Sequence, residues 1–406
     1  MTQRVAIVGS GIGGIRTAQA LRSFGYAGEL TIVGQETDGP YDKPPLSKHF
    51  LAGQHDAEAV SLLTHQEAAE AGISLRLGVP AERIVPDEKC LVLSDGATLP
   101  YDICVVATGA SARPSAWNKL RGVHVLRSMA DSQALRAQLR QKREVAVIGG
   151  GFIGSEVAAT ARSLGLPVTV IDPLPLPMER TLGARVARLV ADLHRRNGVT
   201  TLFGTGVDSI EHSGPQLNLR LSSGATLTTD TVVLGIGATP NDSWLSNSGL
   251  TVRDGLICDE YCRAEGRNDV FGVGDITRWY SPRRDGHVRV EHWTNAVEQA
   301  RCVARNIVFP GELTTYEGIE YVWTDQYDWK IQVAGQPAHD SVATEAAVGD
   351  FDGPRPRGAM LYGDSSGALC GAVTVNWPRA ITLCRQALSA RAPYQETLQA
   401  VTGARR

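Results

Sequence analysis

The feature that most constrains this chain is a glycine-rich motif that occurs twice, each time directly after a short apolar run. Residues 5–14 read VAIVGSGIGG and residues 145–154 read VAVIGGGFIG. The spacing G-x-G-x-x-G is set by Gly9, Gly11 and Gly14, and again by Gly149, Gly151 and Gly154. Such an apolar run is typical of a buried parallel strand, and the glycines permit a tight strand-to-helix turn and close approach of a pyrophosphate. The repeat predicts two βαβ units, each binding a dinucleotide.

The residues after each motif support this interpretation. Residues 15–24 and 153–164 have the pattern of a helix, and each stretch leads into a second apolar strand. The first copy ends near Gln35 and Glu36, and the second ends at Asp172. A carboxylate at this position accepts hydrogen bonds from ribose hydroxyls. We keep both Gln35 and Glu36 as ribose candidates, and Asp172 favours NADH because it would repel the 2′-phosphate of NADPH.

Each copy also has a later apolar strand that ends in a glycine-containing turn. These segments read CVVATG at residues 104–109 and VVLGIGATP at residues 232–240. Their candidate cofactor-binding residues are Ala107, Thr108, Gly109 and Gly237. The sequence predicts an α/β fold with two Rossmann-like domains, one holding a flavin dinucleotide and one a nicotinamide dinucleotide that exchanges.

Composition narrows the class of protein. The 406 residues include 40 basic and 43 acidic side chains, a formal charge of −3, which argues against binding to nucleic acid or to a membrane surface. We find no apolar run long enough to span a bilayer and expect a soluble, cytoplasmic protein. The seven dispersed cysteines do not form a disulfide scaffold, and we interpret Cys258 and Cys262 as small residues near a strand end. No cysteine spacing is typical of an iron–sulfur cluster, so any cluster must be on a separate partner.

Four further segments carry a resemblance to a known family. They read PYDKPPLSK at residues 40–48, GVGDI at 272–276, EHWTNAVEQ at 291–299 and WTDQY at 323–327. With the repeat, they resemble the NADH-dependent, FAD-containing ferredoxin reductases of bacterial oxygenase and cytochrome P450 systems, within the glutathione-reductase-like superfamily. Disulfide reductases of that superfamily carry a cysteine pair early in the chain. Here no cysteine precedes Cys90, which excludes a dithiol at that position.

The resemblance implies both an activity and a domain layout. Electrons would pass from NADH through FAD to a separate [2Fe–2S] ferredoxin, which would serve a cytochrome P450 or a Rieske oxygenase. The FAD-binding domain would be discontinuous, covering residues 1–111 and 244–320. The NAD-binding domain would cover residues 112–243, and a smaller α+β C-terminal domain would cover residues 321–406.

The resemblance also implies roles for single residues. Lys48 would lie at the polar edge of the flavin, where a cation favours the reduced form, and Trp293 would lie beside the flavin ring. Glu156 would lie near the nicotinamide, or would simply complement the dipole of its helix. Asp275, ahead of a possible helix, would bind the ribityl chain. The other cofactor-binding candidates are Gly13, Pro45, Ala81, Arg127, Ile153, Gly274 and His292.

The electron acceptor leaves alternatives open. Basic residues that could form a docking face for an acidic ferredoxin, or simply a solvated face, are Arg278, Arg283, Arg284, Arg301 and Arg305. One rival function is that of an NADH oxidase or rubredoxin reductase of the same fold. The other is that of a redox-signalling flavoprotein resembling apoptosis-inducing factor.

Overall fold

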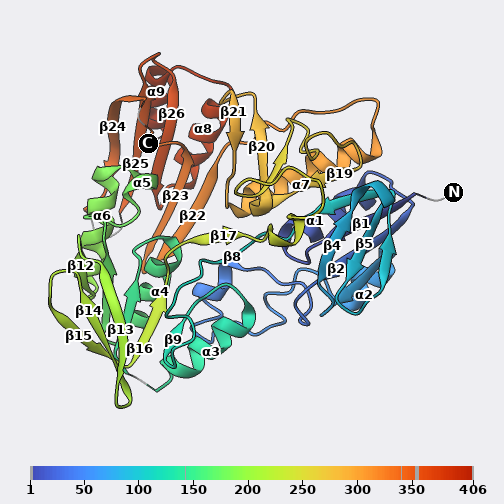
Figure 1. The fold of residues 1–406 in the computed structure, drawn as a ribbon. Helices are drawn as coiled ribbons and strands as arrows, with labels where there is room; N and C mark the ends of the chain where they lie inside the picture. Colours follow the sequence, from blue (N-terminus) through green and yellow to red (C-terminus); the bar gives the residue numbers. More distant parts are fainter. Residues whose placement is uncertain (1–2, 142, 340, 353–355, 405–406) are drawn as a thin grey trace. The chain divides into compact units, whose positions relative to one another are not determined.

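The computed structural model describes residues 3–141, 143–339, 341–352 and 356–404 (Figure 1). The chain forms two compact units, and each is assembled from three separate segments. The first unit contains Met1–Asp42, Ala57–Ser111 and Ala238–Gly318. The second contains Lys43–Asp56, Ala112–Gly237 and Ile319–Arg406.

A five-stranded parallel sheet forms the centre of the first unit. Its strand order is β19-β7-β1-β2-β3. The strands are β1 (Arg4–Val8), β2 (Glu29–Gly34), β3 (Ile73–Leu77), β7 (Ile103–Val106) and β19 (Val270–Gly272). Helix α1 (Ile12–Ser23) follows β1 directly and packs against α7 (Trp293–Val308). Because β1 lies between β2 and β7, the first glycine loop is at the point where the strand order reverses, where such sheets bind ligands.

Smaller elements complete the first unit. One antiparallel sheet contains β4 (Ala81–Val85), β5 (Cys90–Leu93) and β6 (Thr98–Pro100), and α2 is His65–Glu70. Another contains β18 (Leu256–Cys258), β20 (Thr277–Ser281) and β21 (Gly286–Val288), and β8 (Ala110–Ala112) pairs with β17 (Ala238–Pro240).

The prediction of a possible helix after Asp275 was wrong, because the next residues form β20. Thr277, Trp279 and Ser281 are buried and alternate with more exposed neighbours, which is the period of a strand.

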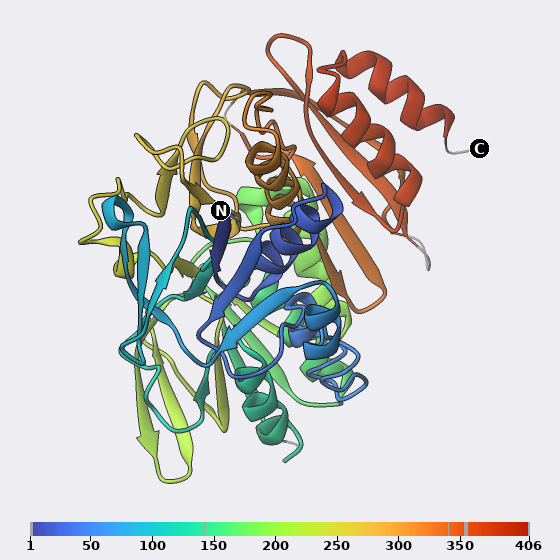
Figure 2. The same ribbon diagram turned by 90° about the vertical axis from the view of Figure 1, so that its right-hand side faces the viewer.

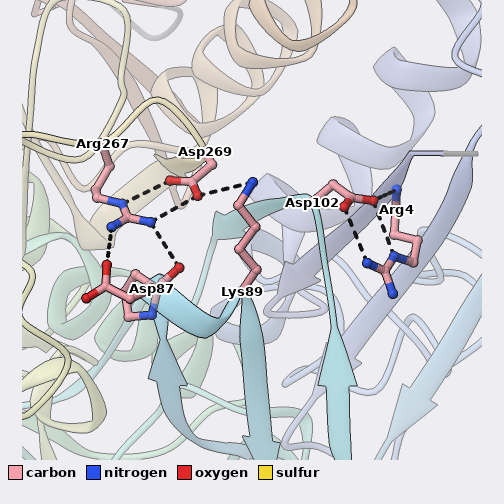
Figure 3. A network of polar contacts seen from close by, with 7 residues as sticks. Arg4, Asp87, Lys89, Asp102, Arg267 and Asp269 are labelled. Carbon is pink, nitrogen blue, oxygen red and sulfur yellow. Dashed lines mark hydrogen bonds and ion pairs between the residues drawn. The ribbon is translucent and has the colours of Figure 1, made fainter. Parts of the chain in front are cut away.

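Two networks of charged side chains join distant segments of the first unit (Figure 3). The Arg267 guanidinium bonds both carboxylate oxygens of Asp269, each at 3.0 Å, and Asp87 at 2.7 Å. Arg4 donates from its backbone N–H at 2.7 Å and from its side chain at 3.2 and 3.3 Å to Asp102. These hydrogen bonds lower the pKa of Asp102. The networks link the three segments from which the unit is assembled.

The second unit contains a second parallel sheet with the same arrangement around its glycine loop. Its order is β12-β11-β10-β16-β9, with β10 (Val145–Ile148) in the place of β1. The other strands are β9 (Val123–His124), β11 (Val168–Asp172), β12 (Thr200–Phe203) and β16 (Thr231–Leu234). The helices of this part are α3 (Met129–Leu139), α4 (Phe152–Ser163), α5 (Glu179–Leu182) and α6 (Ala184–Arg196). A small antiparallel sheet contains β13 (Val207–Ser213), β14 (Gln216–Leu221) and β15 (Thr226–Thr229). The two parallel sheets confirm the predicted pair of Rossmann-like folds.

The C-terminal part of the second unit is an antiparallel sheet with helices on one face. The sheet order is β22-β23-β26-β25-β24. The strands are β22 (Tyr321–Gln326), β23 (Trp329–Gly335), β24 (Val342–Asp350), β25 (Arg357–Asp364) and β26 (Leu369–Val375). Helices α8 (Pro378–Ser389) and α9 (Tyr394–Gly403) lie beside it in Figure 2. Ile331 and Val333 share a buried core with Val186 and Val190 of α6, so the other face of this sheet covers the nucleotide-binding fold. The predicted α+β character is confirmed.

A buried histidine lies where α6 meets the β22–β23 turn. His194 is fully buried, and its Nδ1 is 2.9 Å from the hydroxyl of Tyr327. Tyr327 occupies the left-handed backbone region with φ of 55°. Burial lowers the pKa of His194 from 6.5 to about 4. The imidazole is therefore neutral throughout the physiological range.

The free energy of unfolding is expected to fall as the pH drops from about 6.5 to about 4. The unfolded chain binds a proton at His194 in this window and the folded chain does not, so protonation favours unfolding by up to about 3 kcal/mol. Urea titrations of the wild type and of His194→Gln across this range would measure the effect. The free energy of unfolding should fall less steeply with decreasing pH in the variant. Burial also lowers the pKa of His292 to about 4. Because His292 is present in both proteins, its contribution to the pH dependence cancels in the comparison. Parallel slopes would contradict the assignment.

Candidate dinucleotide-binding sites

The first glycine loop is shaped by two glycines that cannot carry a side chain. A Cβ on Gly9, whose φ is 120°, would be 2.1 Å from the carbonyl oxygen of Ala107. A Cβ on Gly14 would be 1.9 Å from the carbonyl oxygen of Gly9, while the nearest atom to one on Gly13 would be a methyl carbon of Val273 at 3.1 Å. By contrast, a Cβ on Gly11 would have no described atom within 4 Å. The loop is thus closed on the protein side and open at the start of α1.

The second loop repeats this geometry. A Cβ on Gly149, whose φ is 102°, would be 2.3 Å from the carbonyl oxygen of Gly235, and one on Gly154 would be 1.9 Å from that of Gly149. The nearest atom to a Cβ on Gly151 would be 4.0 Å away. Ile153 is 42% exposed, which is high for a large apolar residue and fits a side chain that contacts a ligand. Each open side faces the N-terminus of a helix, where free N–H groups and the dipole favour a pyrophosphate.

The polar residues at the ends of β11 and β2 accept hydrogen bonds from different donors. Asp172 accepts hydrogen bonds from the backbone N–H of Gly150 at 2.6 Å and of Leu174 at 2.7 Å. These bonds hold its carboxylate beside the second glycine loop, where the sequence predicted a ribose contact. In the first copy, Gln35 is exposed, and Glu36 accepts a hydrogen bond from Tyr41. The carboxylate of Glu36 is therefore fixed, which favours it over Gln35 as the ribose ligand.

A second group of candidates in the first unit gathers around the N-terminus of α7. The amide of Gly274 donates to Gln299 at 2.8 Å, which holds the turn containing Asp275 against this helix. His292 is the N-cap residue of α7, and burial lowers its pKa to about 4. The indole N–H of Trp293, the first residue of α7, donates to Asp42 at 2.7 Å. The sequence did not predict roles for Asp42 and Gln299, although they lie in the segments 40–48 and 291–299 that carry the resemblance.

The turns that follow β7 and β16 are held by hydrogen bonds to their backbone carbonyls. The Asn241 amide donates to the carbonyl of Thr108 at 2.8 Å, and the Asn241 N–H donates to Gly109 at 2.9 Å. Gly237 has a φ of 101° and accepts a hydrogen bond from Arg113 at 3.0 Å. Ala81 begins β4, in the small antiparallel sheet rather than in the parallel one.

The second unit buries an ion pair between two residues that the sequence singled out separately. The Lys48 ammonium is 2.8 Å from Oε2 of Glu156, and the two side chains are 12% and 4% exposed. Glu156 also accepts hydrogen bonds from the hydroxyls of Ser47 and, at 2.7 Å, Thr324. Because Glu156 is on the first turns of α4, the pair lies next to the second glycine loop. Ser47 and Thr324 were missed, since neither residue type signals a role by itself.

The segment that carries Lys48 is held from two helices of the same unit. It contains a short 3₁₀ turn, Pro44–Ser47, which includes Pro45. Ser132 of α3 donates to the carbonyl of Leu46 at 2.7 Å, and Thr160 of α4 donates to that of Ser47 at 2.8 Å. Arg127 directly precedes the N-cap residue of α3, and its carbonyl accepts a hydrogen bond from Lys43 at 3.4 Å. The backbone before Lys48 is thus fixed at several points.

Comparisons with known proteins agree with this geometry. Residues 3–300 match the family described as pyridine nucleotide-disulphide oxidoreductase, and residues 321–401 match the family described as reductase C-terminal. The chain therefore belongs to the pyridine nucleotide-disulphide oxidoreductase family. Among its members, the chain is similar to reductase components of oxygenase systems, as the resemblance of its motifs predicted.

The individual similarities extend over nearly the whole chain. Rhodocoxin reductase of Rhodococcus erythropolis is 36% identical over 392 residues, which cover 96% of this chain and 90% of the relative. The ferredoxin–NAD(+) reductase component of the p-cumate 2,3-dioxygenase system of Pseudomonas putida is 34% identical over 385 residues, with 94% and 92% covered. The crystal structure of the covalent putidaredoxin reductase–putidaredoxin complex matches with a TM-score of 0.91 and 32% identity, covering 98% of this chain and 99% of that one.

Proposed function

We propose that this chain is an FAD-dependent NADH:ferredoxin oxidoreductase. The observation that carries the proposal is the presence of two glycine loops with the same open geometry, one in each unit of a chain whose relatives are ferredoxin reductases. The ferredoxin would be a separate [2Fe–2S] protein serving a cytochrome P450 or a Rieske oxygenase. The p-cumate component is named for a dioxygenase system.

The residues of each unit fit one of the two cofactors. In the first unit, the loop at Gly11 would hold the FAD pyrophosphate, Glu36 the adenosine ribose and Asp275 the ribityl chain. In the second unit, the loop at Gly151 would hold the NADH pyrophosphate and Asp172 the ribose. When bound, FAD accepts a hydride from NADH and releases its electrons to the acceptor. The protein's part is to orient the two dinucleotides and to set the charge around them.

The Lys48–Glu156 pair would provide that charge. The ammonium and the carboxylate next to the second glycine loop form a fixed dipole in a region of low dielectric, where its field is strong. Glu156 balances the charge of the ammonium and fixes it in one position. The pair would not need to supply a proton for hydride transfer between the bound cofactors, so its part in that step would be electrostatic.

Among the alternatives, a dithiol mechanism has no support in the chain. The resemblance implies that the Pro44–Ser47 turn stands where disulfide reductases carry cysteines, and all seven cysteines of this chain are free thiols. The solved water-forming NADH oxidase is 22% identical with a TM-score of 0.83, a similarity of fold alone. In the part of the chain that the structure describes, no helix is long and apolar enough to span a membrane. Free thiols are typical of a reducing compartment, so we place the protein in the cytoplasm.

For the docking surface we favour the α7 side of the first unit. The guanidinium of Arg301 lies 5.7 Å from the ring centre of Phe24, and Phe24 meets Phe309 edge-on at 6.2 Å. Phe309 is 42% exposed. Arg278 and Arg305 already form ion pairs with Asp254 and Glu312, both at 3.6 Å. An exposed phenylalanine that packs on a partly buried one, with a basic rim, is typical of a protein interface.

Stopped-flow absorbance on the purified holoenzyme tests the proposal. NADH should bleach the flavin band, and an oxidised [2Fe–2S] ferredoxin added next should be reduced in the same mixing experiment. Flavin reduction without transfer to any of a panel of ferredoxins, combined with rapid consumption of O₂, would favour an oxidase. Slow transfer to every acceptor, with a lasting complex between oxidised nicotinamide and reduced flavin, would favour the signalling alternative.

A further inference from the structure

Three hydrogen-bond donors from different chain segments enclose the Glu156 carboxylate. Lys48 and Ser47 reach Oε2 from the segment before the first helix of the second unit, and Thr324 reaches Oε1 from the C-terminal sheet. Glu156 is 3% exposed and Thr324 is fully buried. Both carboxylate oxygens are therefore engaged, and water has little access to them.

The direction of the Thr324 hydroxyl is itself determined. Gln326 lies on the same face of β22, two residues further on, and its amide N–H donates to the Thr324 oxygen at 3.2 Å. A threonine hydroxyl has one proton to donate. Since the amide donates to Thr324, that proton is available only for Glu156, 2.7 Å away. The contact forms a chain of donors that runs from Gln326 through Thr324 to the carboxylate.

We propose that Thr324 and Gln326 are positioning residues, through which the C-terminal domain orients the Glu156–Lys48 pair for NADH oxidation. The inference rests on the proposed function, because it assigns the pair a role beside the nicotinamide. Thr324 fixes one oxygen of the carboxylate, so that the other faces Lys48. Without this bond the carboxylate is held only at Oε2, by Ser47 and Lys48, so it can turn about its last side-chain torsion. The ammonium keeps its hydrogen bond to the carbonyl of Pro44 at 3.0 Å, but its contact with the carboxylate is loosened.

The test compares Thr324→Val with Thr374→Val. Thr374 is an equally buried threonine of the same sheet, but it pairs with Gln332 on the opposite face and its hydroxyl has no partner among the described residues. The first readout is acetylation of Lys48 in the folded holoenzyme, quantified by peptide mass spectrometry against Lys330, whose side chain is 48% exposed. The rate at Lys48 should rise about fivefold in Thr324→Val, the factor that one lost hydrogen bond corresponds to, and stay at the wild-type value in Thr374→Val.

The second readout separates positioning from binding. The limiting rate of flavin reduction should fall about fivefold to tenfold in Thr324→Val, with the Kd for NADH within about twofold of wild type, since the lost contact orients a charge and does not touch the nucleotide. Thr324→Ser, which keeps the hydroxyl, should restore both readouts. Should the valine variant fail to fold, Gln326→Leu removes the group that aims the hydroxyl and should raise the acetylation of Lys48 as well.

Equal Lys48 acetylation in the two valine variants would overturn the inference. So would a loss in Thr324→Val confined to the Kd for NADH. Failure of the proposed function has a different signature, because NADH would then not reduce the flavin of the wild type. The acetylation readout does not depend on turnover and would still report whether Thr324 positions Lys48.

Discussion

Alanine at Gly154 is expected to prevent stable folding of the second unit, whereas alanine at Gly151 is expected to leave the fold intact and weaken NADH binding. At Gly154 a Cβ would overlap the carbonyl oxygen of Gly149 at 1.9 Å, so the strand-to-helix turn must open. We expect a loss of roughly 3 kcal/mol or more, at the upper end for overpacking. At Gly151 the nearest atom is 4.0 Å from the added carbon, which would instead occupy the space of the pyrophosphate.

Urea denaturation and NADH titration measure the two halves of this prediction. Gly151→Ala should have the wild-type denaturation midpoint and a Kd for NADH raised about tenfold or more, equivalent to at least about 1.4 kcal/mol. The first loop offers a matched pair, because Gly14 and Gly11 have the same surroundings as Gly154 and Gly151. There the affected ligand should be FAD and not NADH. A Gly154→Ala protein as stable as the wild type would refute the assigned geometry.

Removing the carboxylate of Glu156 is expected to destabilise the protein by about 3–5 kcal/mol, the range for breaking one side of a buried ion pair. Glu156→Ala leaves the Lys48 ammonium, which is 12% exposed, without a counter-charge and leaves Thr324 without an acceptor. The free energy of unfolding from urea titration at neutral pH measures the loss. Glu211→Ala, at an exposed position on β13, is the control and should change stability by less than about 0.5 kcal/mol.

A double variant shows whether the loss comes from the unpaired charge. Lys48→Met combined with Glu156→Leu removes both partners and should be more stable than Glu156→Ala alone, because no buried charge is left behind. Its flavin reduction should nevertheless be slow, since the fixed positive charge is gone. If the double variant is as unstable as the single one, the loss is due to packing and not to the ion pair.

Sequence patterns located those parts of the site that depend on local backbone geometry. The glycine loops and the carboxylate of Asp172 follow from a strand, a turn and a helix in order, which a short stretch of chain specifies. The pairing of Lys48 with Glu156 does not follow from any local pattern. Ser47 and Glu156 are 109 residues apart, and Thr324 is 168 residues beyond Glu156. Only the packing of α4 against two other segments brings these side chains together.

The helix predicted after Asp275 was wrong because it relied on a local pattern alone. An aspartate after a glycine turn is a common helix start, and Asp275 was interpreted in that way. The alternating burial of the next residues reflects pairing with β18, which lies earlier in the sequence, and with β21, which follows β20 in a hairpin. The fold around Asp275 thus depends on tertiary pairing that overrides the local preference. The predicted domain boundaries and the roles of the individual cofactor residues remain predictions.

Assembly of each unit from three separate segments has a consequence for synthesis of the chain. The first unit includes residues on both sides of the 112–237 stretch, and the second needs Lys43–Asp56 as well as everything after Gly318. A nascent chain emerging from the ribosome therefore exposes an incomplete first sheet until its last strand, β19, has been made, and the ion pair of Lys48 waits even longer for Thr324. The first unit has all of its segments once Gly318 has been made, whereas the second also needs the residues after it, and no contiguous fragment consists of one unit alone. The second unit is therefore the later one to fold during synthesis, and its first parallel strands expose apolar surface until the segments that cover them have been made.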